Sequence, residues 1–416
     1  MGDFMKRILF FTTLLFIGAT LFAQDGKLLR FKYRKDDNFR ILSTVQEDVK
    51  LNGRLNHHAE IVSRVTINVT DVDENGSGQM NGTFMTSESS KSHVGQNFTW
   101  GEEFKSTYKR DVRGIFDIAD TYFMPTIRNL PVFPEKPVKP GDTWTAEGYE
   151  AEDLRRTFLV EKPFKVPFVA SYEYVRDEVG QSSDSSHAKK TFQVISAKYN
   201  LYYESPAPDN AWELGDYPAS TMGYSNRIIY WDNEKGQIDH CDEQFRIVIE
   251  TVMGNQYDFS GTTHEEVTEF TRTATEEVLR EVQKQVEKLG LENVSVVKAE
   301  KGLTISVENI QFKPDSAELV ASEKEKIKKI AGILQAYPDN DLLVSGHTAL
   351  AGTEQARQQL SEERAESVAN FLVQLGVKDK YHVFTQGFGS RIPIASNKTE
   401  AGKAKNRRVE ITILDK

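Results

Sequence analysis

Apolar and polar residues alternate along much of the first 260 residues, which is the pattern of strands with one buried face. The alternation is clear from Leu29 to Tyr33 and from Val65 to Val69. Turn-forming pairs such as Asn52-Gly53 and Asn75-Gly76 separate the strand-like runs, and no helical pattern interrupts them. The pattern predicts an antiparallel β-rich domain over residues 24–260, folded as a sandwich or as one curved sheet.

The pattern changes between residues 261 and 290, where apolar residues recur every three or four positions and predict one long connecting helix. Thr263 and Glu266 have the spacing of a capping box, and Gly290 follows the last apolar position as a stop signal. Such a helix would be a rigid spacer or a dimerising element, or it would pack on one of the neighbouring domains. The apolar stripe consists of Val267, Phe270, Ala274, Val278, Val282, Val286 and Leu289.

From residue 291 onward, strand-like and helix-like runs alternate. A hairpin is predicted where Val294 to Val297 and Leu303 to Val307 flank a Glu-Lys-Gly turn, and a helix carries Ile327 to Leu334. A buried strand follows at Leu342 to Val344, then a second helix, and a closing strand ends the run. Residues 291–416 are therefore predicted to form an α+β domain of β-α-β-α-β order, with helices on one face of a mixed sheet.

The first residues have the composition of an export signal. Lys6 and Arg7 precede an apolar run that ends at Ala23, which predicts a signal peptide over residues 1–23. The run is short for a membrane span, and no later apolar run is long enough for one. The only cysteine, Cys241, lies far from this run, so anchoring through a lipid-modified N-terminal cysteine is not expected. The predicted location is the periplasm, with outer-membrane association as an open alternative.

The charge of the chain is acidic overall but uneven. The 416 residues carry a formal net charge of −10, which argues against a nucleic acid partner. The acidic excess lies before residue 291, whereas the rest of the chain is nearly neutral. Within that later part, the segment from Arg391 to Arg408 holds six basic residues and a single acid, Glu400. This local positive charge suits an anionic ligand.

Four short motifs follow one another in the last third of the chain. Gly346-His347-Thr348 follows the buried strand, and the next helix carries Leu360-Ser361 and Arg364-Ala365. Gly387-Phe388-Gly389 comes next, and the segment from Asn406 to Glu410 reads NRRVE. In their order and approximate spacing, these motifs resemble those of the OmpA-like peptidoglycan-binding family.

An arginine on the second helix is directed toward the loop that follows the buried strand, and an arginine pair enters the last strand. The planar fork of a guanidinium matches the two oxygens of a carboxylate, so these residues suit a carboxylate ligand. The family resemblance implies that this ligand is peptidoglycan, held by the carboxylates of its stem peptide. It further implies a carboxylate clamp at Arg364, a second positive charge at Arg407, donors at Thr348 and the loop backbone, and an apolar contact at Leu360.

Two positions depart from the family pattern. Ala349 stands where the family carries an aspartate that meets the amine of a zwitterionic stem residue, and Arg357 stands where the helix usually carries asparagine. Alanine cannot accept a hydrogen bond from an amine. Three alternatives follow: Glu354 or another acid replaces the aspartate, the stem carries a different diamino acid, or the site has degenerated and the domain is a structural or interaction module. Arg364 also has a structural alternative, an ion pair with Glu410 or with a carboxylate of its own helix.

Signs of catalysis are weak in this sequence. It contains no zinc-protease or serine-hydrolase motif and no paired Cys and His with metal-ligand spacing. Cys241 lies in a strand-rich region without a helix N-terminus to activate its thiol. The segment from Asp71 to Gly76 matches half of a calcium loop but lacks the final glutamate, which favours a hairpin tip. The chain is therefore predicted to be non-enzymatic, without a cofactor or a metal.

The β-rich region does not disclose its partner, for which an envelope protein is a candidate. Its aromatic residues either fill the core or line a groove for glycan or peptide, since Trp and Tyr stack well on such ligands. These residues are Trp100, Tyr122, Trp144, Tyr202, Tyr203, Trp212 and Trp231.

Overall fold

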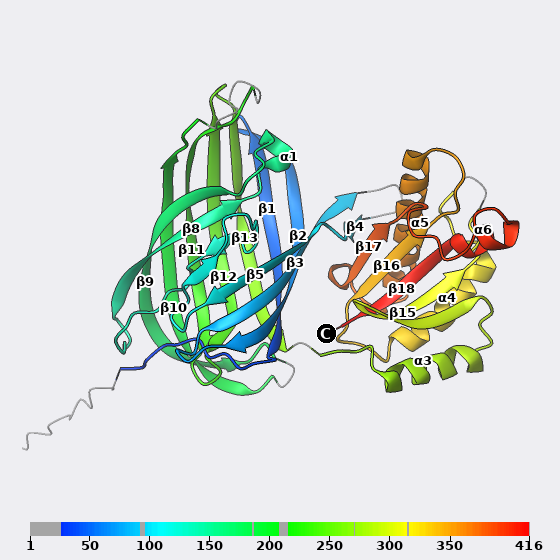
Figure 1. Cartoon of the computed structure of the whole chain (residues 1–416), viewed down its shortest axis with the longest axis horizontal. Coiled ribbons are helices and arrows are strands. Elements are labelled where there is room, and N and C mark those ends of the chain that lie inside the picture. The colour runs from blue at the N-terminus through cyan, green and yellow to red at the C-terminus, as the bar shows by residue number, and fades with distance from the viewer. Residues whose placement is uncertain are drawn as a thin grey trace, which may run out of the picture.

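A computed structural model describes the chain in six ranges. The predicted signal peptide, residues 1–23, and Trp212 lie outside the described residues. The described strands form one continuous hydrogen-bonded network of 18 strands. It divides into an N-terminal and a C-terminal part, which are joined through β3 (Gly78–Lys91) and β4 (Gln96–Thr99) (Figure 1). The described ranges are residues 26–91, 96–184, 187–207, 215–269, 271–313 and 316–415.

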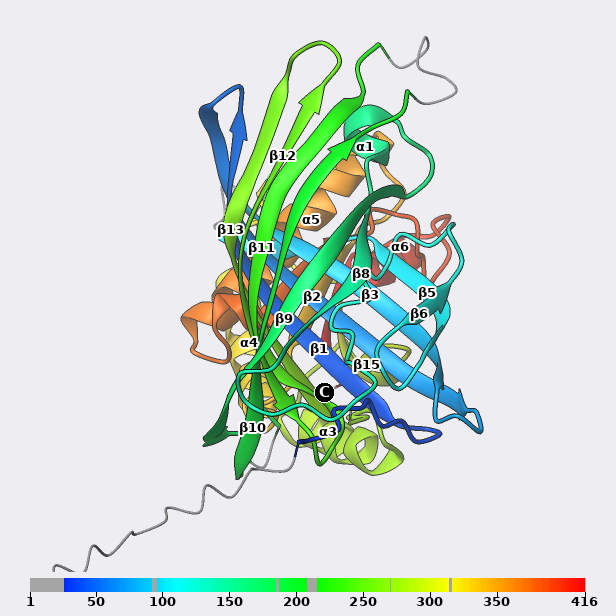
Figure 2. The same cartoon turned by 90° about the vertical axis from the view of Figure 1, so that its left-hand side faces the viewer.

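The N-terminal part is one antiparallel sheet that curves around its own apolar face (Figures 1 and 2). Each strand pairs with the next from one edge to the other, so the curved-sheet prediction describes the fold and the sandwich prediction is wrong. A short helix, α1 (Arg155–Phe158), links two of the strands. In sheet order the strands are β6 (Phe116–Ile118), β5 (Glu103–Arg110), β3, β2 (Arg54–Val72), β1 (Asn38–Leu51), β13 (Gln256–Glu269), β12 (Gln237–Thr251), β11 (Pro218–Asp232), β10 (Lys189–Glu204), β9 (Phe164–Gln181), β8 (Thr143–Glu152) and β7 (Ile127–Arg128).

Apolar side chains fill the inside of this curve. Trp231 is fully buried, and its ring centroid lies 4.5 Å from that of Phe133 and 4.8 Å from that of Phe31. Ile67 and Val69, which belong to the alternating pattern, are buried as well. The apolar positions of the period-two pattern therefore form the inner face of the sheet, as the alternation predicts.

Neighbouring strands approach each other unusually closely at two glycines. A Cβ atom at Gly223 would lie 2.2 Å from the carbonyl oxygen of Arg246, and one at Gly261 would lie 2.1 Å from that of Gln46. No side chain fits at either position without pushing the strands apart. These glycines permit the tight curvature of the long strands β11 and β13.

The predicted connecting helix over residues 261–290 is wrong in its first part. Residues 256–269 instead form β13, which pairs with β1 on one side and β12 on the other. Thr263, Glu265 and Val267 also fit a period of two, and the β-branched residues among them favour a strand once partners are available on both sides. The capping box of Thr263 and Glu266 consequently does not form.

The helix that does form is short and belongs to the C-terminal part. α3 spans Glu276–Lys288, and the side chain of Thr275 caps it by accepting a hydrogen bond from the Val278 N–H. Val282 and Val286 are buried in the core of the C-terminal part. Of the predicted alternatives, α3 is therefore a helix packed on one domain. None of the helices in the described ranges combines the length and apolar character that a membrane crossing requires.

The C-terminal part is a mixed sheet with α3, α4 and α5 packed on one face. Its strand order is β14-β15-β18-β16-β17, and within it only β16 and β17 run parallel. The elements are β14 (Val294–Ala299), β15 (Gly302–Glu308), α4 (Ala321–Leu334), β16 (Leu342–His347), α5 (Glu354–Gln374), the 3-10 helix η1 (Lys380–His382), β17 (Val383–Gly387), α6 (Glu400–Asn406) and β18 (Arg408–Leu414).

The other face of this sheet meets the N-terminal part. β4, which follows β3 in the chain, adds to the edge of the C-terminal sheet by pairing in parallel with β17, with Phe98 opposite Phe384. The Trp100 N–H donates to the Thr385 carbonyl oxygen at 2.7 Å, and the Trp100 ring meets Phe384 edge-on at 5.5 Å. A strand and an aromatic cluster together join the two parts.

A buried ion pair lies beside this cluster. Arg64 of β2 pairs with Asp341, and each side chain is only 8% exposed. The His382 Nδ1 lies 2.7 Å from the same carboxylate. Burial alone would raise the pKa of Asp341, but Arg64 and His382 outweigh it and hold that pKa below its ordinary value. The carboxylate is therefore ionised and accepts from both domains.

We expect the C-terminal part to lose stability as the pH rises above about 6.5, because the hydrogen bond to Asp341 raises the pKa of His382 above its ordinary value of 6.5. A raised histidine pKa stabilises the folded state fully below the unfolded value, and that contribution is lost as the pH rises through the folded value. Melting temperatures measured from pH 5.5 to 8.5 should fall with pH in the wild type and fall less in His382→Gln. Parallel curves for the two proteins would contradict this assignment.

Candidate functional site

Two glycines and a serine from the sequence motifs set the position of α5 on the sheet. A Cβ atom at Gly346 would lie 2.0 Å from the Ser361 carbonyl oxygen, and one at Gly387 would lie 2.6 Å from the Ser361 hydroxyl. That hydroxyl accepts a hydrogen bond from the Gly389 N–H at 2.8 Å. The motif residues thus bring the helix into direct backbone contact with the ends of β16 and β17.

One face of α5 is thereby held above these strand ends. Arg357, Leu360 and Arg364 are spaced by three and four residues, so they lie on the same side of the helix. All three side chains are half-buried. The structure therefore brings together three of the predicted site residues on one surface.

Arg364 is half-buried and forms no ion pair with a carboxylate among the described residues. The carbon of its guanidinium lies 4.7 Å from the centroid of the Phe312 ring. Its buried Nε has no hydrogen-bond partner in the described part of the chain. Burial, followed by the nearby charge of Arg407, lowers the pKa of Arg364, and the charge of Glu363 on the same helix opposes this shift. The fold thus keeps a guanidinium partly desolvated beside a second positive charge, which is unfavourable unless an anion compensates it.

Arg407 follows α6 directly, at the point where the chain turns into β18. Among the described residues, neither Arg407 nor Arg364 has a carboxylate oxygen within 4.0 Å. The predicted alternative, an ion pair of Arg364 with Glu410, is wrong. The Glu410 carboxylate instead accepts a hydrogen bond of 2.7 Å from the Nε of the buried Arg408.

The loop after β16 supplies fewer donors than the resemblance implied. The Thr348 N–H donates to the Gly389 carbonyl oxygen at 2.8 Å, and the Leu350 N–H donates to the Asn397 side chain at 3.0 Å. The hydroxyl of Thr348 is buried without a partner among the described residues. Ala349 is buried beside it. Of these groups, the Thr348 hydroxyl has hydrogen-bonding capacity to spare.

Arg357 is directed toward its own loop. Its Nη1 donates to the Gly352 carbonyl oxygen, whereas its buried Nε has no partner in the described ranges. This bond ties the start of α5 to the loop that holds Ala349. Arg357 therefore adds positive charge to the site while also fixing the loop.

Sequence reasoning missed the residues that support the arginines. Phe312 provides the ring beneath Arg364. His347 stacks on Phe388 with centroids 5.1 Å apart, and burial lowers its pKa. Burial opposes ionisation of Glu410, but the neighbouring His347 and Arg408 bring its pKa to about 2. The rings of His347 and Phe388 and the side chains of Arg408 and Glu410 thus pack against one another.

The family model described as the OmpA family matches residues 311–407. These residues form an OmpA family domain. The resemblance seen in the motifs is thereby confirmed for this part of the chain, and no family model matches the N-terminal region. Homologues of the domain include proteins named for peptidoglycan binding.

Relatives of the OmpA domain come from several bacteria. The peptidoglycan-binding protein ArfA of Mycobacterium tuberculosis is 43% identical over 104 residues, which are 25% of this chain and 32% of ArfA. The probable lipoprotein YiaD of Escherichia coli is 39% identical over 121 residues, which are 29% of this chain and 55% of YiaD. The chain thus spans about a third to about a half of these curated relatives.

Solved structures include OmpA-like proteins as well. The peptidoglycan-associated lipoprotein of Burkholderia pseudomallei is 29% identical, and the alignment covers 26% of this chain and 87% of that protein, with a TM-score of 0.23.

Outside the OmpA domain, the other candidates in the sequence have structural roles. Burial raises the pKa of the Cys241 thiol, so this cysteine is not activated. Asp73, in the predicted hairpin tip, accepts hydrogen bonds from the N–H groups of Asn75 and Ser77. No group of metal-binding side chains is found in the described part of the chain.

Proposed function

We propose that the OmpA domain binds peptidoglycan without chemistry of its own, holding a stem-peptide carboxylate with Arg364 and Arg407. The observation that supports this most is the half-buried Arg364, whose Nε has no hydrogen-bond partner in the described part of the chain and whose charge lies near that of Arg407. A carboxylate bound there would supply the missing counter-charge through charge-assisted hydrogen bonds. The names of the relatives agree with this ligand.

Each side chain of the site would then have a distinct role. The fork of Arg364 holds the carboxylate, and Phe312 beneath it fixes the plane of the guanidinium. Arg407 adds a second charge, and the Thr348 hydroxyl donates one further hydrogen bond. Leu360, between the two arginines of α5, contacts the apolar part of the stem.

The site as proposed binds an anion, and among the described residues position 349 supplies no acceptor for an amine. Ala349 is buried, and the nearby Glu410 is occupied by Arg408. Glu354, the suggested replacement acid, is exposed in the first turn of α5. A stem whose diamino acid presents its carboxylate without a neighbouring free amine is therefore the ligand that suits this chain best.

We expect Ala349→Asp to raise the affinity for stem peptides with a zwitterionic diamino acid by about tenfold, because the new carboxylate would accept from the amine. Isothermal titration with soluble muropeptides measures the change. Ala349→Asn, which has the same size but no charge, is the matched control and should gain less. Equal affinities for all three proteins would count against this role of position 349.

Retention on purified sacculi tests the function as a whole. The protein without residues 1–23 should sediment with sacculi and be released by an excess of soluble muropeptide. A degenerate site, the second candidate function, predicts no retention of the wild type. Release of muropeptides from the sacculi during incubation would instead indicate an enzyme. We further propose that the protein is exported to the periplasm and that the β-rich part engages another envelope component.

A further inference from the structure

The curved sheet of the N-terminal part opens between two of its strands. The hydrogen-bonded pairing of β9 with β10 begins where Gln181 lies opposite Lys189. It ends where Ser171 lies opposite Lys198. From Ala170 back to Phe164, β9 pairs only with β8, while the matching stretch of β10 pairs only with β11. Two strand edges with unpaired backbone groups therefore face each other across the opening.

The sequence explains why the sheet separates at this place. Pro167 lies in the middle of the unpaired stretch of β9, and proline cannot donate to a ladder. Phe168, the next residue, points inward and stacks on Tyr199 of β10 with ring centroids 3.9 Å apart. Pro167 thus prevents regular pairing at this place, while the stacked rings of Phe168 and Tyr199 hold the two strands together in the core.

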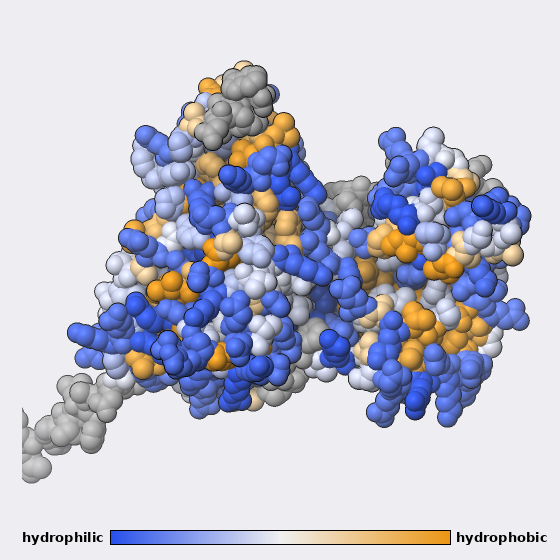
Figure 3. All heavy atoms as spheres, viewed as in Figure 1, coloured by the Kyte–Doolittle hydropathy of each residue, from blue (hydrophilic) through white to orange (hydrophobic). Residues whose placement is uncertain are grey.

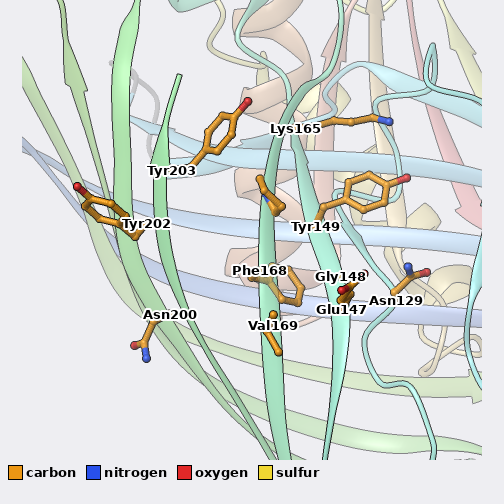
Figure 4. Close-up of a pocket in the computed structure, with 11 residues that line it drawn as sticks. Asn129, Glu147, Gly148, Tyr149, Lys165, Phe168, Val169, Asn200, Tyr202 and Tyr203 are labelled. Atoms are coloured by element: carbon orange, nitrogen blue, oxygen red, sulfur yellow. The ribbon is translucent and has the colours of Figure 1, made fainter. Parts of the chain in front are cut away.

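A pocket of about 910 Å³ lies on the outer face over this opening (Figure 4). Tyr202 is 72% exposed and Val169 is 58% exposed, so both side chains are open to solvent. A second pocket of about 330 Å³ shares Lys165 and Tyr203 with the first and therefore lies next to it; the two pockets together are called the groove. The first pocket is lined by residues of β8, β9 and β10 together with Asn129.

The groove combines aromatic rings with uncharged polar groups. Tyr149, Tyr202 and Tyr203 come from two different strands and flank the opening. The Asn129 side-chain oxygen accepts from the Phe116 N–H, which leaves its NH2 group to donate, and Asn200 lines the groove on the other side.

The charges of the groove nearly cancel. Lys165 pairs with Asp120 and lies 5.0 Å from the centroid of the Tyr149 ring, and Glu147 offers a single opposite charge. Hydrophilic residues dominate this side of the molecule, with only small apolar patches among them (Figure 3). The chemistry therefore fits a neutral ligand that has both apolar faces and many hydroxyl groups.

We propose that this groove binds a neutral oligosaccharide. A sugar ring would stack on the exposed Tyr202, and its hydroxyl groups would bond with the asparagine amides and the unpaired strand edges. An extended peptide added as a strand fits less well, because Pro167 removes a donor from the centre of the β9 edge. The site is separate from the arginine site and does not depend on it.

The test uses the full chain without residues 1–23 and two probes free of carboxylates, the β-1,4-linked tetramers of N-acetylglucosamine and of glucose. We expect at least one tetramer to bind, and Tyr202→Ala to raise its dissociation constant by about three- to tenfold. Tyr202→Phe, which keeps the ring, should bind nearly as well as the wild type. Tyr230→Ala removes a tyrosine of β11 outside the groove, and Arg364→Ala alters only the carboxylate site, so both should bind normally.

Three results would overturn the proposal. The first is that neither tetramer binds at millimolar concentration. The second is that Tyr202→Ala and Tyr230→Ala weaken binding equally, which would place the sugar elsewhere. The third is that an extended peptide displaces the bound tetramer at equal or lower concentration, which would make the opening a strand-addition site. Loss of sugar binding in Arg364→Ala would also contradict the separation of the two sites.

Discussion

Replacing Arg364 by alanine is expected to abolish retention of the protein on sacculi. A hydrogen bond to a charged group contributes about 1.5–3 kcal/mol, so the dissociation constant for a muropeptide should rise by about 10- to 100-fold. Arg364→Lys keeps the charge but loses the planar fork of donors. Its dissociation constant should therefore lie between those of the wild type and Arg364→Ala. Sedimentation with sacculi and titration with muropeptides measure the same loss independently.

The controls for Arg364 separate binding from folding. Because its guanidinium is half-buried beside Arg407 without a carboxylate, removing it should not lower the melting temperature, and Arg364→Met keeps the contact with Phe312. Lys328→Ala removes an exposed positive charge from α4 of the same domain and should leave retention unchanged. A variant of Arg364 that is retained like the wild type would disprove the clamp.

Arg64→Ala is expected to uncouple the two parts of the molecule. Removing one partner of a buried ion pair typically costs about 3–5 kcal/mol. Because Asp341 would keep His382 and the nearby charge of Arg40, we expect the lower end of this range. Arg64 also donates to the Asp415 carbonyl oxygen at 3.2 Å and lies 5.9 Å from the centroid of the Trp100 ring, so several contacts are lost together. Calorimetry should show a lower melting temperature with separated transitions, and amide exchange in β4 and β17 should accelerate.

A second ion pair between the same parts provides a matched control. Lys105 and Glu300 lie 3.5 Å apart with side chains that are largely exposed. Exposed pairs contribute little to stability, so Lys105→Ala should leave the melting temperature nearly unchanged. If Arg64→Ala and Lys105→Ala behave alike, the buried pair does not hold the junction.

Local patterns predicted the class of each part, but they placed the start of the helix between them too early. The alternation around Ile67 and Val69 specifies a strand face, because it follows from the geometry of the strand alone. The segment around Val267 fits periods of both two and 3.6, and its pairing with β1 and β12 decides between them. Such pairing depends on residues more than 200 positions away, which no local pattern records.

The candidate site was predictable to the extent that motifs mark it. Thr348, Leu360, Arg364 and Arg407 were found through the resemblance, and the structure places the arginines near each other. The occupied N–H of Thr348 could not be predicted, since it depends on how the loop packs against Gly389. For the same reason, the junction formed by β4 and β17 left no signal in the sequence.

The addition of β4 to the C-terminal sheet has a mechanical consequence. If only the chain between β13 and α3 joined the two parts, they could rotate freely against each other. Here a second connection runs from β3 through β4 to β17. Tension from an anchored polymer would be shared between the two connections and could not twist one part against the other. The curved sheet would then keep a fixed orientation relative to the polymer that the C-terminal part is proposed to bind.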